Sequence, residues 1–133
     1  MGTVAQIMIK ELQTVGPDTT VRSAAKHMNE SRLGSLFVKK EQAIVGIVTD
    51  TDLVRRALAS SKDLNALTVG DIMTSPVATI EGTRTVSDAH DMMGDLGIRH
   101  LGVTTAGEIV GVISVRDLLR YYQRVSEPKI AQD

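Results

Sequence analysis

The sequence predicts a mixed α/β fold (α+β) built from two copies of one β-α-β-β-α unit. The first observation is that the chain aligns with itself without a gap when it is shifted by 65 residues, which places Val4 on Val69 and Asp52 on Asp117. The second is that apolar residues in each copy recur first at helical spacing and then in short runs typical of strands. The third is that short polar segments separate these runs, as the turns of hairpins do.

The duplication repeats the same landmarks in the same order. Ile7-Met8 falls on Ile72-Met73, and residues 44–46 fall on residues 109–111. Internal repeats of this kind bury a shared core between copies. A single copy of about 60 residues buries too little surface on folding to be more than marginally stable by itself. We therefore expect the copies to pack about a pseudo-twofold axis. The expected boundaries are repeat 1 at 1–60, a polar linker at 61–68, repeat 2 at 69–123 and a fraying C-terminal tail at 124–133.

Each element has a local reason. A Val-x-x-Ile-Met turn opens each copy, and short extended pieces follow at 14–15 and 77–80. Helices of about ten residues come next, and Val21, Ala24 and Met28 share one apolar face of the first. Thr85 and Asp88 match a capping box at the start of the second. Strands are predicted at 35–39, 44–49, 99–104 and 109–114, with closing helices from about Thr51 and about Arg116.

Composition excludes several classes of function. The chain has no cysteine, which excludes disulfide scaffolds, thiolate metal sites and cysteine nucleophiles. The 15 Lys and Arg against 16 Asp and Glu give a net charge of −1, so no global positive field attracts nucleic acid or an anionic membrane. No apolar run approaches the roughly 20 residues of a transmembrane helix, and the first residues do not resemble a signal peptide. We expect a cytoplasmic protein with no nucleic-acid or membrane partner.

A seven-residue motif at the end of the second hairpin strand is the candidate for chemistry. It reads GIVTDTD at residues 46–52 and GVISVRD at residues 111–117. The helix that follows offers free backbone N–H groups and a partial positive charge, which suit a phosphate. The hydroxyl residue can hold a polar ligand atom, and the last aspartate can accept both hydrogens of a cis-diol such as that of ribose. The glycine is interpreted as space for a ligand beside the backbone.

The same residues also have a purely structural interpretation. Thr49 with Asp52, and Ser114 with Asp117, match the capping box as well. Duplication copies a cap as readily as it copies a binding site. Both interpretations stay open at the level of the sequence.

The order and duplication of these motifs resemble a known family. The repeated unit, with Ile-Met near its start and G-h-h-[ST]-x-x-D near its end, resembles a pair of CBS domains, called a Bateman module. The resemblance covers Val4 to about Tyr122. It implies a stand-alone regulatory module that binds AMP, ADP, ATP, NAD or S-adenosylmethionine in clefts between the repeats. It further implies a homodimer, an unidentified regulated protein and no required cofactor beyond the adenine nucleotide as regulatory ligand.

The resemblance also implies roles for individual positions. The motif aspartate contacts ribose, and the hydroxyl residue lies beside ribose or phosphate. Residues before the first hairpin strand contact phosphate, and the segment before the first helix lines the base pocket. The implied primary cleft comprises Asp117, Ser114, Arg116, Arg99, His100, Thr14, Val15, Thr20 and Ser35. The implied secondary cleft comprises Asp52, Thr49, Thr51, Val77, Thr79 and Thr85.

The two implied clefts differ in charge. Arg99 and His100 stand where the first copy has residues 34–35, a glycine and a serine. An arginine fork and an imidazole match a phosphate well. The cleft of Asp117 is therefore predicted to be primary. The cleft of Asp52 has no motif-linked basic residue, and it binds phosphate more weakly, holds an uncharged ligand or stays empty. The alternatives are an exposed strand residue for the arginine and a partly buried structural residue for the histidine.

Catalysis is not expected. Asp52 and Asp117 belong to separate clefts, and neither has a second acid, a Ser/His/Asp set, a metal-ligand cluster or a phosphate-loop lysine beside it. The sequence thus predicts no catalytic and no metal-binding residues. The competing function is a ligand-free homodimeric scaffold whose clefts are vestigial.

Overall fold

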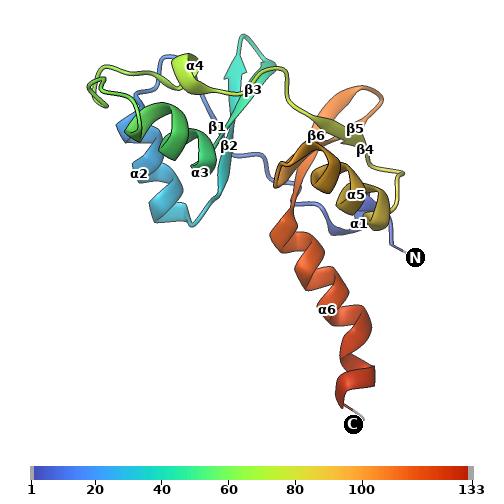
Figure 1. The fold of residues 1–133 in the computed structure, drawn as a ribbon. Coiled ribbons are helices and arrows are strands. Elements are labelled where there is room, and N and C mark those ends of the chain that lie inside the picture. Colours follow the sequence, from blue (N-terminus) through green and yellow to red (C-terminus); the bar gives the residue numbers. More distant parts are fainter. Residues whose placement is uncertain (1, 132–133) are drawn as a thin grey trace. The chain divides into compact units, whose positions relative to one another are not determined.

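The computed structural model describes residues 2–131, with side chains over residues 2–126. It contains the β-α-β-β-α order twice, so the predicted mixed α/β fold is confirmed (Figure 1). The first repeat contains α1 (Val4–Ile7), β1 (Thr14–Val15), α2 (Val21–Ser31), β2 (Ser35–Lys40), β3 (Ala43–Thr49), α3 (Asp50–Asp52) and the π-helix η1 (Leu53–Leu58). The second contains α4 (Val69–Ile72), β4 (Thr79–Glu81), α5 (Val86–Leu96), β5 (His100–Thr105), β6 (Glu108–Ser114) and α6 (Val115–Ala131).

The chain divides into two compact units that do not coincide with the repeats. The central unit is Leu12–Val77, and the split unit is the segment up to Glu11 together with the described chain from Ala78 onward. The opening segment of each repeat thus belongs to the unit that contains the other repeat's sheet. In particular, α1 lies in the split unit and α4 lies in the central unit.

Each unit contains one three-stranded sheet of the same design. The strand order is β1-β2-β3 in the central unit and β4-β5-β6 in the split unit. The first pair of each sheet is parallel, and the second pair is an antiparallel hairpin. Ser35 pairs with Thr49, and His100 pairs with Ser114. The register places the start of one hairpin strand beside the end of the other, where the motif lies.

Each sheet packs against helices through a buried apolar cluster. The apolar face predicted for α2 is buried, because Val21, Ala24 and Met28 are each at most 4% exposed. The central cluster consists of Val21, Ala24, Met28, Leu36, Val38, Val48, Ala57, Leu67, Val69 and Ile72. The split-unit cluster consists of Val4, Ile80, Val86, Ala89, Met93, Leu101, Val103, Ile113 and Leu118. Val4 and Val69 show that the exchanged opening segments contribute to the cores they join.

Local capping interactions define the ends of α2 and α5, the helices that pack against the hairpins. The Thr20 hydroxyl accepts the Ser23 N–H at 3.2 Å at the start of α2. The capping box predicted for α5 is confirmed, because Thr85 N donates to Asp88 and Asp88 N donates to Thr85 Oγ1. At its other end α5 stops at Gly97, whose positive φ of 66° suits glycine.

The opening segments pair with the outer strand of the sheet they join. Ile9 N donates to Val112 O at 2.8 Å, and Val112 N donates to Ile9 O at 3.0 Å. Thr74 makes the same two bonds with Ile47, at 2.8 and 3.0 Å. These equivalent pairs hold each opening segment against the strand that ends in the motif.

The motif glycines have a packing role that the sequence interpretation missed. A Cβ on Gly111 would lie 2.5 Å from Met8 Sδ and 3.0 Å from the Ile9 carbonyl oxygen. A Cβ on Gly46 would lie 2.6 Å from Met73 Sδ. The space beside these glycines is therefore filled by the Ile-Met segments. The interpretation of that space as room for a ligand is wrong.

The closing helix of the second repeat is longer than predicted. The sequence predicts a fraying tail from residue 124, whereas α6 continues to Ala131. Leu119 and Val125 are 65% and 54% exposed. Apolar periodicity reports burial, and a helix that buries few residues loses that pattern while its local backbone hydrogen bonds continue. Over residues 2–131, no helix combines the length and the apolar character that crossing a bilayer requires.

We expect Gly111→Ala to destabilise the fold and Gly94→Ala to stabilise it slightly. The first substitution forces Met8 and the Ile9 backbone to move, and overpacking of this kind costs about 1–3 kcal/mol. Gly94 lies within α5 with nothing within 4 Å of an added Cβ, and alanine favours a helix by about 0.5–1 kcal/mol over glycine. Urea denaturation followed by circular dichroism measures both. Equal stability of the two variants would contradict the packing role of Gly111.

The pKa of Asp88 predicts a pH effect on stability. Its pKa is lowered from its usual value, chiefly because its carboxylate accepts the Thr85 backbone N–H, with the Thr85 hydroxyl and Arg84 adding to this effect. A lowered folded-state pKa stabilises the fold above the unfolded-state pKa of about 3.9, and that stabilisation is lost as pH falls through the folded value. Asp88→Asn should therefore lose less stability than wild type between neutral and acid pH. Melting temperatures at stepped pH test this, with exposed Asp95→Asn as the control for removing a carboxylate.

Candidate functional site

The motif aspartates lie at the strand-to-helix junctions of the two units. Asp117 lies in the first turn of α6, directly after β6, and Asp52 ends α3, directly after β3. The start of the preceding hairpin strand lies beside each junction. The Val115 N–H donates to the Arg99 carbonyl at 3.0 Å, and the Asp50 N–H donates to the Gly34 carbonyl at 3.0 Å. The sequence-predicted grouping of the strand start with the motif is thus present within each unit.

The carboxylate of Asp117 caps its helix with one oxygen. Oδ2 accepts the Ser114 N–H at 2.8 Å and the Ser114 hydroxyl at 3.0 Å. The Asp117 N–H donates back to Ser114 Oγ at 3.3 Å. Across the part of the chain that the structure describes, the hydrogen bonds to this carboxylate all end on Oδ2. The capping interpretation therefore holds, and it leaves Oδ1 uncommitted.

The carboxylate of Asp52 is engaged at both oxygens. Oδ2 accepts the Thr49 N–H at 3.0 Å and the Thr49 hydroxyl at 3.2 Å. Oδ1 accepts the Thr74 hydroxyl at 3.2 Å and lies 3.7 Å from Arg56 Nε. Asp52 is only 6% exposed. Among the side chains that the structure describes, it is the one charged side chain that is buried. Its carboxylate therefore links the helix cap at Thr49 to the opening segment at Thr74.

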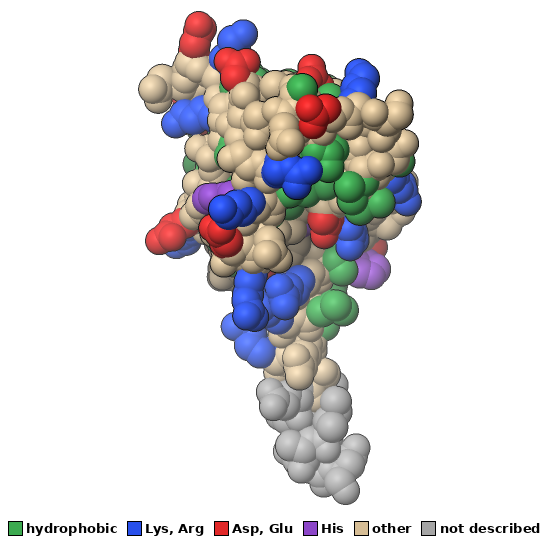
Figure 2. All heavy atoms as spheres, turned by 90° about the vertical axis from the view of Figure 1, so that its left-hand side faces the viewer, with side chains coloured by type: hydrophobic (Ala, Val, Ile, Leu, Met, Phe, Trp, Pro, Cys, Tyr) green, Lys and Arg blue, Asp and Glu red, His purple; other side chains and the backbone are tan. Residues whose placement is uncertain are grey.

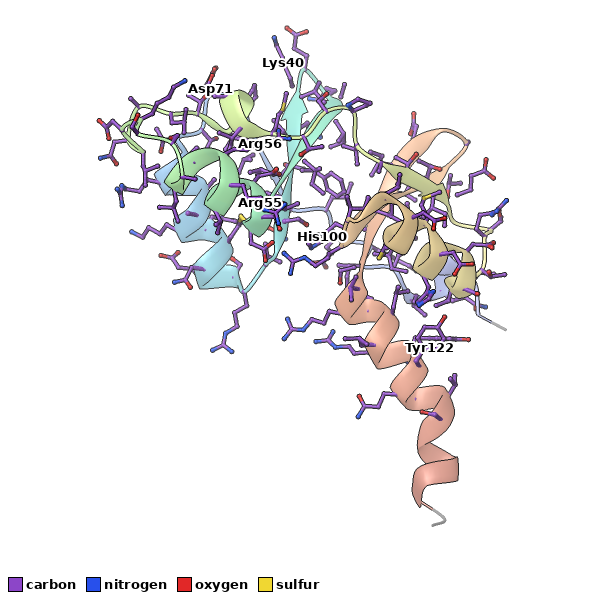
Figure 3. The ribbon with its side chains drawn as sticks, viewed as in Figure 1. Lys40, Arg55, Arg56, Asp71, His100 and Tyr122 are labelled. Atoms are coloured by element: carbon purple, nitrogen blue, oxygen red, sulfur yellow. The ribbon has the colours of Figure 1, made fainter. Side chains whose placement is uncertain are left out.

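Arg56 is a basic residue that the sequence analysis did not associate with Asp52. Besides its contact with that carboxylate, its Nη1 donates to the carbonyls of Ile72 and Met73 at 3.3 and 3.2 Å. Figure 3 labels it on the closing helix of the central unit. The first motif and its strand start contain no basic residue, and Arg56 supplies a cation to Asp52 from outside them. Its spacing four residues after Asp52, one helical turn, was the available signal.

A hollow of about 500 Å³ lies within the split unit beside Asp117. This volume falls in the range of about 300–1,000 Å³ that is usual for small-ligand sites. The lining residues are Gln6, Ile7, Ile9, Asp117, Arg120, Gln123 and Arg124. The hollow combines a carboxylate, two cations, two amides and an apolar wall.

The arginines of the hollow come from one face of α6. Arg120 and Arg124 line the hollow, and Arg116, one turn before Arg120, does not; all three side chains are exposed. Figure 2 shows basic side chains gathered along the helix that leads to the grey end. Of the three, Arg116 alone lies within the seven-residue motif, and the other two lie beyond the reach of that pattern. Their spacing of three and seven residues from Asp117 places them on the aspartate's face of the helix.

The other sequence-predicted site residues divide between the units. Some have structural partners of their own: Thr14 and Val15 pair with β2, while the Thr20 and Thr85 hydroxyls cap helices. The split unit holds Arg99, His100, Ser114, Arg116, Asp117, Thr79 and Thr85, and the central unit holds Thr14, Val15, Thr20, Ser35, Thr49, Thr51, Asp52 and Val77. Each implied cleft draws residues from both units. The assembly of those complete clefts stays a prediction.

Comparison with known proteins decides the family. Residues 4–59 and residues 69–124 each match the CBS domain. The chain belongs to the CBS-domain family. Both matches begin at the Val-x-x-Ile-Met turn and contain the seven-residue motif, so the resemblance drawn from the sequence is confirmed.

Relatives of this CBS pair include proteins of archaea, bacteria and a plant. An uncharacterized 17.7 kDa protein of Acidianus ambivalens is 39% identical over 119 residues, which are 88% of this chain and 71% of that protein. A putative signal-transduction protein with CBS domains from Burkholderia ambifaria is 32% identical, with a TM-score of 0.86 over 90% of this chain and 93% of that one. The structure of CBSX2 in complex with AMP shares the fold, with a TM-score of 0.78 at 24% identity over 95% and 99% of the two chains.

Proposed function

We propose that this CBS pair is a regulatory module that binds an adenosine-containing nucleotide at the motif of its second repeat. The observation that carries the proposal is the Asp117 carboxylate, which lines a hollow of suitable size while only its Oδ2 is committed to the helix cap. A carboxylate oxygen with lone pairs to spare is an acceptor for a ribose diol. The proposal does not include catalysis.

The rest of the hollow suits the other parts of a nucleotide. Arg120 and Arg124 supply two guanidinium groups for phosphate oxygens. Ile7 and Ile9 supply an apolar wall for a base. Gln6 and Gln123 carry amide donors and acceptors that can orient polar edges. The charge pattern favours a phosphorylated ligand over a free nucleoside.

The adenosine part of the proposal comes from the family. The CBS domain is known as a module for adenosine ligands, and the CBSX2 structure of the same fold contains AMP. AMP is therefore the first ligand to test, with ADP, ATP, NAD and S-adenosylmethionine beside it. We extend the proposal to a homodimer, which is supported by exposed Leu96, Leu119 and Val125 on α5 and α6.

Asp117→Asn should weaken AMP binding roughly tenfold or more. Hydrogen bonds to a charged group contribute about 1.5–3 kcal/mol, and each 1.4 kcal/mol is about tenfold in affinity. Isothermal titration calorimetry measures the change, with exposed Glu108→Gln in the β5–β6 hairpin as the control. Folded wild type that gives no heat and no melting shift with any of the five ligands would favour the ligand-free scaffold instead.

Arg120→Gln and Arg124→Gln should weaken AMP binding more than adenosine binding. These substitutions remove positive charge from the hollow while they keep polar side chains on an exposed helix face. We expect several-fold losses for AMP that shrink as the salt concentration rises, because salt screens exposed charges. Parallel titrations of AMP and adenosine give the ratio. Equal losses for both ligands would contradict phosphate recognition by these arginines.

A further inference from the structure

One position of the opening segment differs in chemistry between two otherwise equivalent junctions. Thr74 follows Met73, and Ile9 follows Met8, at matching places in the two repeats. Both residues make the same pair of backbone hydrogen bonds, Thr74 with Ile47 and Ile9 with Val112. The backbone therefore brings either side chain to the strand that ends in a motif aspartate.

The side chain at this position changes what the motif aspartate can do. The Thr74 hydroxyl donates to Asp52 Oδ1 at 3.2 Å and lies 3.4 Å from Oδ2. Ile9 has no polar side-chain atom, so it offers Asp117 no such bond. Both residues lie at their junctions, because Ile9 and Asp117 line the same hollow.

The second difference strengthens the first. Arg56 lies 3.7 Å from Asp52 Oδ1, while its counterpart in the second repeat is Tyr121. The Tyr121 hydroxyl accepts the Gly2 N–H at 3.0 Å. The aromatic ring supplies no cation to Asp117. Asp52 thus has a hydroxyl and a guanidinium on the oxygen that Asp117 leaves uncommitted.

We propose that the residue after the Ile-Met pair decides whether the adjoining motif can take a ligand diol. Thr74 acts as an internal substitute for the diol at Asp52, and Ile9 leaves Asp117 open. The chain accordingly binds one nucleotide, and the Asp52 motif is a structural lock. This inference rests on the proposed nucleotide binding at Asp117 and adds the residues that select between the two motifs.

A diol at Asp52 would have to displace bonds that already exist. The Asp52 side chain is only 8% exposed, and its oxygens already accept from Thr49 and Thr74. Exchange of one hydroxyl for another gains little, whereas the described protein donors to Asp117 all lie on Oδ2 and need not be displaced. The physical difference between the motifs is therefore that side chains of the protein already contact the second oxygen of Asp52.

The test exchanges the two side chains. Ile9→Thr should lower AMP affinity roughly tenfold, because its hydroxyl competes for Asp117 Oδ1. Ile9→Val is the matched control, because it is branched in the same way and carries no hydroxyl. Thr74→Val, made together with Asp117→Asn, should raise AMP affinity above that of Asp117→Asn alone, because it removes the hydroxyl from Asp52 Oδ1. Thr74→Ser in the same background keeps a hydroxyl and should restore nothing.

The number of AMP molecules bound per chain, the affinity of Ile9→Thr and binding by wild type together separate the possible outcomes. Calorimetric stoichiometry should be one AMP per chain for wild type, and two would overturn the inference. Unchanged affinity in Ile9→Thr, with wild type still binding through Asp117, would overturn this inference alone. Failure of wild type to bind at all would overturn the proposed function itself.

Measurements of unfolding without ligand test the Thr74–Asp52 bond directly, and they show whether a variant has failed to fold. A double-mutant cycle of unfolding free energies between Thr74→Val and Asp52→Ala should show coupling, because each change removes the same bond. Circular dichroism melts confirm that each variant is folded before titration. Additive effects in the cycle would show that Thr74 does not hold Asp52, and they would overturn the lock.

Discussion

The pairing of each opening segment with the outer strand of a sheet is the constraint on which both candidate sites depend. It requires a glycine in the strand, because a side chain on Gly46 or Gly111 would collide with Met73 or Met8. Once the segment is seated, its next residue is fixed by two backbone hydrogen bonds to the strand. The side chain of that residue therefore lies at the strand-to-helix junction, where the motif aspartate occupies the first turn of the helix.

Capping and ligand binding are compatible uses of the same aspartate. A carboxylate has two oxygens with about four lone-pair sites, and a capping box uses only some of them. At Asp117 the cap takes Oδ2, so the helix start is stable whether or not a ligand is present. At Asp52 the same cap exists, and Thr74 adds a bond on the other oxygen. The two motifs therefore differ in what reaches the second carboxylate oxygen.

Local signals made much of the fold predictable. The hairpins and the Thr85–Asp88 cap depend on residues close together in sequence, and the duplication is visible when the chain is aligned with itself; the structure contains all three. Thr74 was missed because it reaches Asp52 through the exchange of opening segments, which no local pattern reveals. The contact of Arg56 with Asp52 could not be predicted for a different reason. The two residues are one helical turn apart, but this spacing is also common between residues on solvent-exposed helix faces. The full length of α6 was missed because few of its later residues are buried.

The two units show how similar junctions can carry different chemistry. In both, a side chain from the closing helix holds an opening segment: Arg56 through the Ile72 and Met73 carbonyls, and Tyr121 through the Gly2 N–H. An arginine does this while also contacting the motif carboxylate, because its guanidinium has donors in several directions. A tyrosine hydroxyl anchors the segment without drawing on Asp117. In the second repeat the opening segment is anchored without use of the motif carboxylate, whereas in the first repeat Arg56 contacts both. This separation is the basis for proposing Asp117, and not Asp52, as the ligand-binding aspartate.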